Sequence, residues 1–281
     1  MDKGRPITRR QFVALGAGVV VVACAAGITW ETNRLVLTQV EVSSPRLPQS
    51  FDGLRIAHVS DYHNKVFMRG EPVMGLVREL TPDLIAITGD LVDRNRTNLD
   101  VGYALVDGCV ATAPTYYVPG NHENGVKDRA GLYQHIRDLG AHVMIFSSEE
   151  VWRGNEAIRI AGVPDPVAPG HWLAGVAAQG PATTGDGVFT MLLSHRPETF
   201  DEYVAAEYDL VLTGHAHGGQ VCLPGGQAIL APHQGFFPRY THGVHVQGQT
   251  AMVVSRGIGE SSFPIRVNCP PEVVLVTLRR S

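Results

Sequence analysis

The sequence is poor in cysteine and contains no internal repeat or low-complexity tract. Four cysteines occur among 281 residues, and none has the CxxC spacing of a zinc-thiolate site. Three of them lie beyond residue 30, an odd number that predicts no disulfide framework, although one pair could form outside the cytoplasm. The sequence therefore excludes a small disulfide-stapled fold. Its apolar fraction of 44% is instead enough for an extensive core.

Basic side chains are also scarce outside the N-terminus. Residues 1–30 hold four of the 23 basic and one of the 27 acidic side chains, so the remainder carries 19 basic and 26 acidic groups, a net charge of −7. Binding to a nucleic-acid backbone requires an excess of positive charge. We therefore expect no nucleic acid as the main partner.

One long uncharged run is present, from Phe12 to Trp30, and it follows a basic start. We interpret residues 1–30 as a targeting segment, 31–50 as a connector and 51–281 as one folded domain. The stretch TRRQFV from Thr8 resembles the twin-arginine export signal of bacteria, with Arg9 and Arg10 as the arginine pair. A generic basic flank of a membrane helix is the alternative.

The fate of this leader stays open among three outcomes. It could be cleaved near Ala23-Cys24-Ala25, lipidated at Cys24, or retained as a membrane anchor, because 19 uncharged residues at about 1.5 Å each nearly span a bilayer. All three place the domain at the cell membrane or in the extracytoplasmic envelope.

Beyond the leader, apolar strand patterns alternate with helical ones, and the last third is rich in turns and strands. This order predicts an α/β sandwich. The expected strands are 54–60, 83–90, 115–122, 141–146, 157–163, 187–195, 209–217, 227–230, 250–255 and 272–278, with a short one at 35–42. The expected helices are 73–80, 99–110, 130–139 and 197–206.

Polar side chains gather where five of these strands end. They are Asp61, His63, Asp90, Asn121, His122, His195, His215 and His217. Carboxyl ends of strands are where α/β sheets bind ligands, so we expect these residues to share one rim. A single Asp-x-His or Gly-Asp pair is a weak signal, whereas GHAHGG from Gly214 is strong, because two histidines among glycines have little packing role.

Imidazole, carboxylate and amide oxygen without thiolate suit manganese, iron or zinc. The order DxH, GD, GNH(E), H, GHxH resembles the calcineurin-like binuclear metallophosphoesterase superfamily. That resemblance implies a four-layer α-β-β-α sandwich of two mixed sheets and two divalent metal ions per protomer. It implies that Asp61, His63 and His217 hold one ion, that Asn121, His195 and His215 hold the other, and that Asp90 bridges them. A hydroxide activated by both ions would attack phosphorus.

The resemblance also implies a catalytic role for His122, which would remain unligated and donate a proton to the leaving group, with Glu123 as its orienting partner. Asp93 is either a supporting residue or a turn carboxylate. The other histidines are interpreted as structural, namely His58, His135, His142, His171, His233, His242 and His245.

GHAHGGQVCLPG from Gly214 and SRGIGESSFPIRVNCPPEV from Ser255 are similar to membrane-associated or twin-arginine-exported bacterial phosphohydrolases, related to pyrophosphatases that act on UDP-2,3-diacylglucosamine. The substrate implied is a phosphodiester or pyrophosphate, with a lipid-linked one included, and the N-terminal segment would supply membrane contact. Arg239 and Arg256 are candidates for phosphate binding. Phe236, Phe237 and Phe263 form either an apolar lip or core packing.

Two other functions remain open at this point. One is a metal-dependent hydrolase of carbon esters or amides. The other is an inactive, metal-stabilised binding module, which the complete set of ligand residues disfavours.

Overall fold

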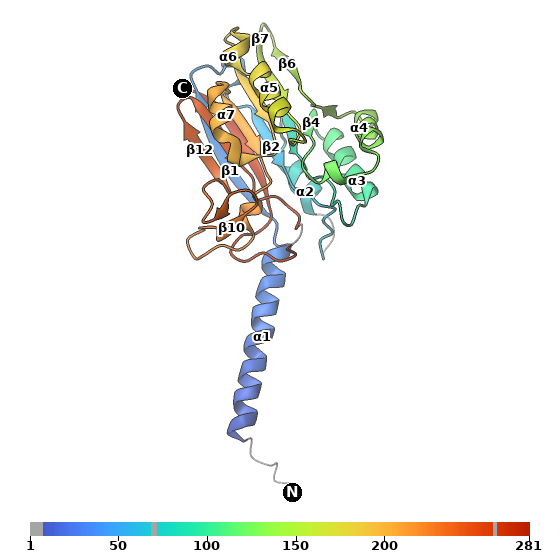
Figure 1. Cartoon of the computed structure of the whole chain (residues 1–281), viewed down its shortest axis with the longest axis vertical. Coiled ribbons are helices and arrows are strands. Elements are labelled where there is room, and N and C mark those ends of the chain that lie inside the picture. The colour runs from blue at the N-terminus through green and yellow to red at the C-terminus, as the bar shows by residue number, and fades with distance from the viewer. Residues whose placement is uncertain (1–7, 69–71, 261–262) are drawn as a thin grey trace.

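The computed structural model describes residues 8–68, 72–260 and 263–281. Lys3 and Arg5 of the predicted leader and Ser261 and Ser262 of the quoted C-terminal stretch lie outside these ranges. Two six-stranded mixed sheets lie face to face, with helices on their outer faces (Figure 1). The predicted α-β-β-α sandwich is confirmed.

The first sheet has the order β1-β14-β2-β3-β4-β5, and three helices cover its outer face. β14 runs parallel to β1 and antiparallel to β2, and the other neighbours are parallel. The bounds are β1 Val36–Ser44, β14 Glu272–Arg280, β2 Arg55–Val59, β3 Leu84–Thr88, β4 Thr115–Val118, β5 His142–Val143, α2 Pro72–Glu79, α3 Leu99–Val110 and α4 Arg129–Asp138.

The second sheet has the order β12-β13-β9-β8-β7-β6; α5 and α7 pack on its outer face, and the short α6 contacts α5. Its central strands β13, β9, β8 and β7 are parallel, and the two edge strands are antiparallel. The bounds are β12 Gly243–Gln247, β13 Thr250–Val254, β9 Leu210–Thr213, β8 Thr190–Leu193, β7 Glu156–Gly162, β6 Ser147–Arg153, α5 Pro169–Gln179, α6 Pro181–Thr184 and α7 Phe200–Ala205.

Strand periodicity explains the layers. In β3, Ile85 and Ile87 pack against the helices, while Leu84 and Ala86 face the second sheet. Because successive side chains of a strand alternate between faces, a strand that is apolar at every position is buried on both sides. The middle strands of both sheets follow this pattern.

Short elements complete the fold. These are the 3₁₀ turns η1 Gln49–Phe51, η2 Glu123–Gly125, η3 Pro197–Thr199 and η4 His217–Gly219, and the strands β10 Leu230–Ala231 and β11 Gly235–Phe236. The helix predicted over 197–206 begins as η3 and continues as α7. β6, β12 and α5 were not predicted. The polar sequence of β6 lacks strand alternation, and β6 and β12 are the two edge strands of the second sheet.

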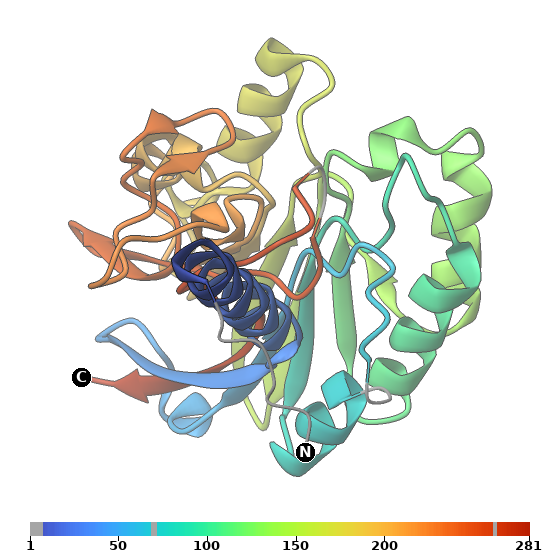
Figure 2. The ribbon, with the colours of Figure 1, turned by 90° about the horizontal axis from the view of Figure 1, so that it is seen from below.

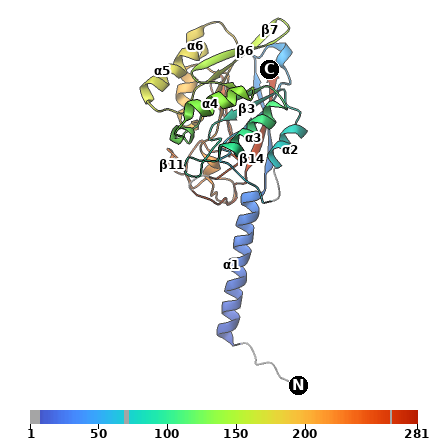
Figure 3. The same ribbon diagram turned by 90° about the vertical axis from the view of Figure 1, so that its right-hand side faces the viewer.

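Helix α1, Arg9–Asn33, projects away from the body (Figures 1 and 3). Its segment Leu15–Asn33 is long and apolar enough to cross a membrane, judged by length and composition. Only Arg34 and Leu35 separate α1 from β1, so the predicted connector contains an edge strand of the first sheet. All four cysteines are free thiols.

Candidate metal centre

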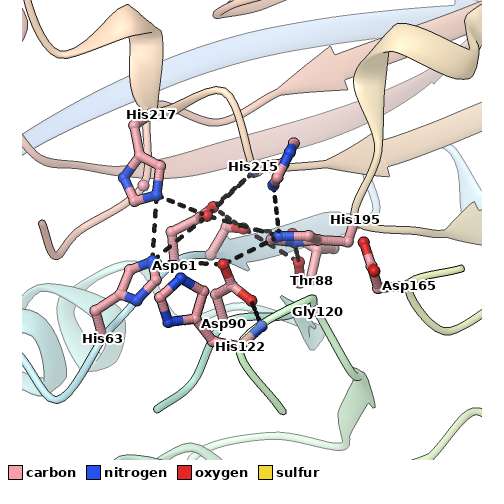
Figure 4. Close-up of polar contacts among 12 residues, drawn as sticks. Asp61, His63, Thr88, Asp90, Gly120, His122, Asp165, His195, His215 and His217 are labelled. Carbon is pink, nitrogen blue, oxygen red and sulfur yellow. Dashed lines mark hydrogen bonds and ion pairs between the residues drawn. The ribbon is translucent and has the colours of Figure 1, made fainter. Parts of the chain in front are cut away.

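The predicted ligand residues lie together at one edge of the sandwich. Asp61 and His63 follow β2, Asp90 follows β3 and Asn121 follows β4, whereas the remaining three, His195, His215 and His217, follow β8 and β9 of the second sheet. Figure 4 shows these loops converging from both sheets. Parallel strands in each sheet end at this edge, which explains why distant parts of the sequence meet there.

One group of side chains contains Asp61, His63, Asp90 and His217, whose candidate ligand atoms all lie within 4.8 Å of one another. His63 Nε2 is 3.2 Å from His217 Nε2, and Asp61 Oδ1 is 3.3 Å from His217 Nε2. All four residues are buried. Imidazole and carboxylate atoms aimed at one point are a typical divalent-cation site.

A second group contains Asp90, His195 and His215. His195 Nε2 lies 3.2 Å from His215 Nδ1. Asp90 Oδ2 is 3.2 Å from His195 Nε2 and 3.5 Å from His63 Nε2, so one carboxylate oxygen faces both groups (Figure 4). This geometry fits a carboxylate shared between two cations.

Asn121 provides an independent test of the fit. Its Oδ1 is shielded from solvent and has no hydrogen-bond partner among the described residues. A buried carbonyl oxygen without a partner is costly, and coordination to a hard cation would satisfy it. The donor set of this edge therefore fits divalent metal ions.

The backbone at this edge adopts an unusual conformation. Asp61, His63, Asp90, His215 and His217 have φ values of 51°, 48°, 50°, 64° and 50°. Left-handed backbone costs free energy in residues other than glycine, and it concentrates at functional sites. The surrounding structure holds these five residues where their side chains converge.

Gly214 and Gly120 allow two loops to approach the carboxylates. A Cβ at Gly214 would collide with Ser60 Oγ and Asp61 Oδ2, and one at Gly120 would collide with Asp90 Oδ1. Only hydrogen fits in these places.

The pKa values of the histidines at this edge reflect burial and the nearby carboxylates. Burial lowers the pKa of His63 and of His217 to about 3, so both rings are neutral at pH 7, the form that binds metal. Burial lowers the pKa of His195 as well, but the charges of Asp90 and Asp61 outweigh burial and raise it to about 10. Two buried carboxylates thus draw a proton where cations would otherwise balance them.

His122 is buried beside this centre, and its ring meets the His63 ring edge to face at 4.4 Å. The amide N–H of Arg94 donates to its Nδ1 at 3.1 Å, so neutral His122 carries its proton on Nε2. Glu123 was expected to orient His122. The structure instead shows its carboxylate accepting from the amides of Asp90 and Val92 at 3.0 and 3.2 Å, which fixes the loop after β3.

Sequence reasoning missed Arg196 and His233. His215 Nε2 lies 2.9 Å from His233 Nδ1 and 3.2 Å from Arg196 Nη1, and Arg196 is ion-paired with Asp165 and Glu198. The sequence could have indicated Arg196, since it directly follows the predicted ligand His195. No sequence pattern indicates His233, because it lies in a turn-rich segment and reaches His215 through loop packing alone.

The two arginines predicted to bind phosphate have other contacts. Arg256 Nη2 lies 2.8 Å from Glu272, and Arg239 is exposed with its guanidinium 4.9 Å from the centre of the Tyr240 ring. Asp93 is buried and accepts from the amide of Asn95 at 2.7 Å.

Most of the other histidines make packing contacts. His58 Nε2 lies 2.8 Å from Thr88 Oγ1 in the core, His135 contacts Tyr103, and His142 stacks on Tyr116. His171, His242 and His245 contact Phe146, Thr241 and Tyr240.

Comparison with known proteins places the chain in a family. The family model of the calcineurin-like phosphoesterases matches residues 54–219, more than half of the chain and the whole predicted ligand set. The chain belongs to the calcineurin-like phosphoesterase family. Membership identifies a metal-dependent phosphoesterase and implies divalent metal ions at the edge described above.

Three relatives are similar over long stretches. The uncharacterized metallophosphoesterase YkuE of Bacillus subtilis is 28% identical over 98% of this chain and 99% of its own. The phosphodiesterase YaeI of Escherichia coli is 28% identical over 71% of this chain and 72% of its own. A transmembrane protein with a metallophosphoesterase domain from Danio rerio is 26% identical over 87% of this chain, which spans only 57% of that relative.

Proposed function

We propose that this chain is a binuclear phosphodiesterase or pyrophosphatase of the cell envelope. Asp61, His63 and His217 would hold one divalent ion, and Asn121, His195 and His215 would hold the other. The observation that carries the proposal is the position of Asp90, whose Oδ2 faces both groups of ligand atoms at 3.2 and 3.5 Å. Manganese, iron and zinc all suit this donor set.

When bound, a pair of divalent ions neutralises phosphate oxygens and lowers the pKa of a water molecule enough to supply hydroxide. The side chains of the protein would position the reacting groups and transfer protons. Asp90 is held by the amide N–H of His122, which donates to its Oδ1 at 2.8 Å. Glu123, in the loop after β4, accepts hydrogen bonds from the amides of Asp90 and Val92 in the loop after β3. Its carboxylate therefore fixes these two loops relative to each other.

His122 is the proposed proton donor. The Arg94 amide occupies Nδ1, which leaves Nε2 protonated and available to the leaving-group oxygen. His122 can act as this acid without binding a metal ion.

The leader supports the envelope location. Arg9 and Arg10 are the first two residues of α1 and precede its uncharged stretch, as in twin-arginine signals. A lipid-linked phosphodiester or pyrophosphate, of the class that includes UDP-2,3-diacylglucosamine, agrees with such a location. Arg239 stays a candidate for substrate contact because its guanidinium is exposed. Arg256 would have to break its ion pair with Glu272 before it could bind phosphate.

The test is hydrolysis of bis-p-nitrophenyl phosphate by the manganese-loaded full-length protein, compared with p-nitrophenyl acetate. We expect the phosphodiester to be the preferred substrate. The His122→Ala variant should lose about 10²–10⁴-fold in kcat and keep its metal content, because a proton donor is removed and no ligand is. His135→Ala is the matched control, since His135 is an exposed histidine on α4.

Full turnover by His122→Ala would contradict the role of His122. Preference for the acyl ester would favour the carbon-ester hydrolase instead. Absence of turnover on both substrates with two metals bound would favour the binding module.

A further inference from the structure

The end of the body from which α1 leaves is also the end that holds the metal centre. Strand pairing shows this directly: Val36 at the start of β1 lies opposite Glu272 at the start of β14, and Val274 lies opposite His58 near the end of β2. The start of β1 therefore lies at the edge where Asp61 follows β2. Figure 2, seen from below, shows α1 in front of this end of the body.

Side-chain contacts join the last turn of α1 to loops that carry the centre. Lys65, two residues beyond His63, donates from Nζ to the carbonyl oxygen of Thr32 at 3.1 Å and to Glu260 at 2.7 Å. The amide of Arg266 donates to Thr32 Oγ1 at 3.0 Å. The last turn of the helix is thus attached to the body through Thr32.

Large apolar side chains are exposed around this end. Val66 is 75% exposed and Phe236 is 74% exposed. We define the apolar rim as Val66, Met68, Leu230, Phe236, Phe237 and Phe263. The segments of Phe237 and Phe263 are linked, since Gln220 Nε2 donates to the carbonyl oxygen of Phe263 at 2.6 Å, the amide of Ile229 donates to the carbonyl oxygen of Val221 at 3.1 Å, and the amide of Phe237 donates to that of Ile229 at 2.9 Å. Clustered apolar exposure of this kind marks a surface that contacts another apolar phase.

A cleft of about 660 Å³ lies between α1 and the body at this junction, and Trp30, Asn33, Phe67 and Met68 are among its lining residues. It faces the part of α1 that is apolar enough for a membrane interior. An acyl chain is the kind of group that such a cleft accommodates.

We propose that the lipid bilayer entered by α1 is the partner of the apolar rim, and that the metal centre opens against the bilayer surface. Only Arg34 and Leu35 separate α1 from the body, so a membrane-embedded α1 holds the rim at the headgroup layer. Phosphate esters carried by bilayer-held molecules are then the substrate class within reach. The substrate class rests on the proposed phosphoesterase function, whereas the docking surface does not.

The test uses full-length protein in vesicles of phosphatidylcholine and phosphatidylglycerol. In a Cys24→Ser background, a nitroxide is attached to Val66→Cys, Phe236→Cys or Val246→Cys. Val246 is a matched control: it is 68% exposed but pairs with Ala251 at the far end of the sheet. We expect the ratio of oxygen to water-soluble nickel-chelate collisions to be severalfold higher at 66 and 236 than at 246. Equal ratios at all three positions would overturn the docking surface.

A second measurement tests the substrate class in the same vesicles. Two p-nitrophenyl phosphodiesters are compared, one of a long-chain alcohol held in the bilayer and one of methanol in solution. We expect kcat/KM to be severalfold higher for the long-chain ester, and equal values would overturn the substrate class. If neither ester is hydrolysed, the phosphoesterase function fails, while the nitroxide ratios still decide the docking surface.

Discussion

At the residue scale, Asp90 occupies the position shared by both ligand groups. Asp90→Asn should therefore lower the content of both metals together, because an amide carries no charge to bridge two cations. His217→Ala should empty mainly one position, since His217 lies in only one group. Metal content per protomer, measured after purification and dialysis, distinguishes the two. Loss of the same amount of metal in both variants would contradict the assignment of ligands to two ions.

The positions of polar residues just after predicted strands indicated which side chains meet at one edge, whereas their assignment as metal ligands came from the resemblance to a family. Asp61, Asp90 and His195 each follow a buried apolar strand, and the carboxyl ends of neighbouring strands share an edge. Contacts between loops could not be predicted from the order of the strands in the sequence. His233 touches His215 only because the segment between them folds back, and no local pattern encodes that return.

At the element scale, the loop between β9 and η4 approaches the end of β2 through Gly214. Gly214→Ala should destabilise the protein by about 1–3 kcal/mol, because the added Cβ collides with Ser60 Oγ and displaces the Asp61 carboxylate. The same substitution should reduce metal content.

Gly75→Ala is the matched control on α2. Its Cβ would meet nothing within 4 Å, and alanine favours a helix interior, so stability should rise by about 0.5–1 kcal/mol. Thermal unfolding in detergent measures both variants. A rise for Gly214→Ala would show that the loop has room that the structure does not.

Sequence patterns predicted the buried elements better than the exposed ones. β3 and β9 are buried at every position; β3 was predicted within two residues at both ends, and β9 within one residue at its start but four residues too long at its end. β6 carries Glu149 and Glu150 and is held by its pairing with β7, a tertiary contact that periodicity does not report. Edge strands depend on their neighbours more than on their own residues.

At the scale of the whole molecule, the proposed twin-arginine export depends on Arg9 and Arg10. Replacing Arg9 and Arg10 with lysine should stop export, because a twin-arginine signal requires the arginine pair. Digestion of intact spheroplasts by an added protease measures this: the natural chain should be degraded and the variant protected. Export of the variant at the natural level would show a different route, and replacement of Arg34 and Arg46 with lysine is the matched control.

The backbone conformation at the metal centre bears on the cellular compartment in which the protein would acquire its metal ions. Five residues of these loops are in left-handed conformation, and two of them, Asp61 and Asp90, carry buried carboxylates, so bound divalent cations would offset both costs and complete the arrangement of the loops. The twin-arginine route carries chains that have already folded. A molecule exported by the proposed route would therefore acquire its ions in the cytoplasm, and the ion supply of that compartment would decide which metals reach the envelope.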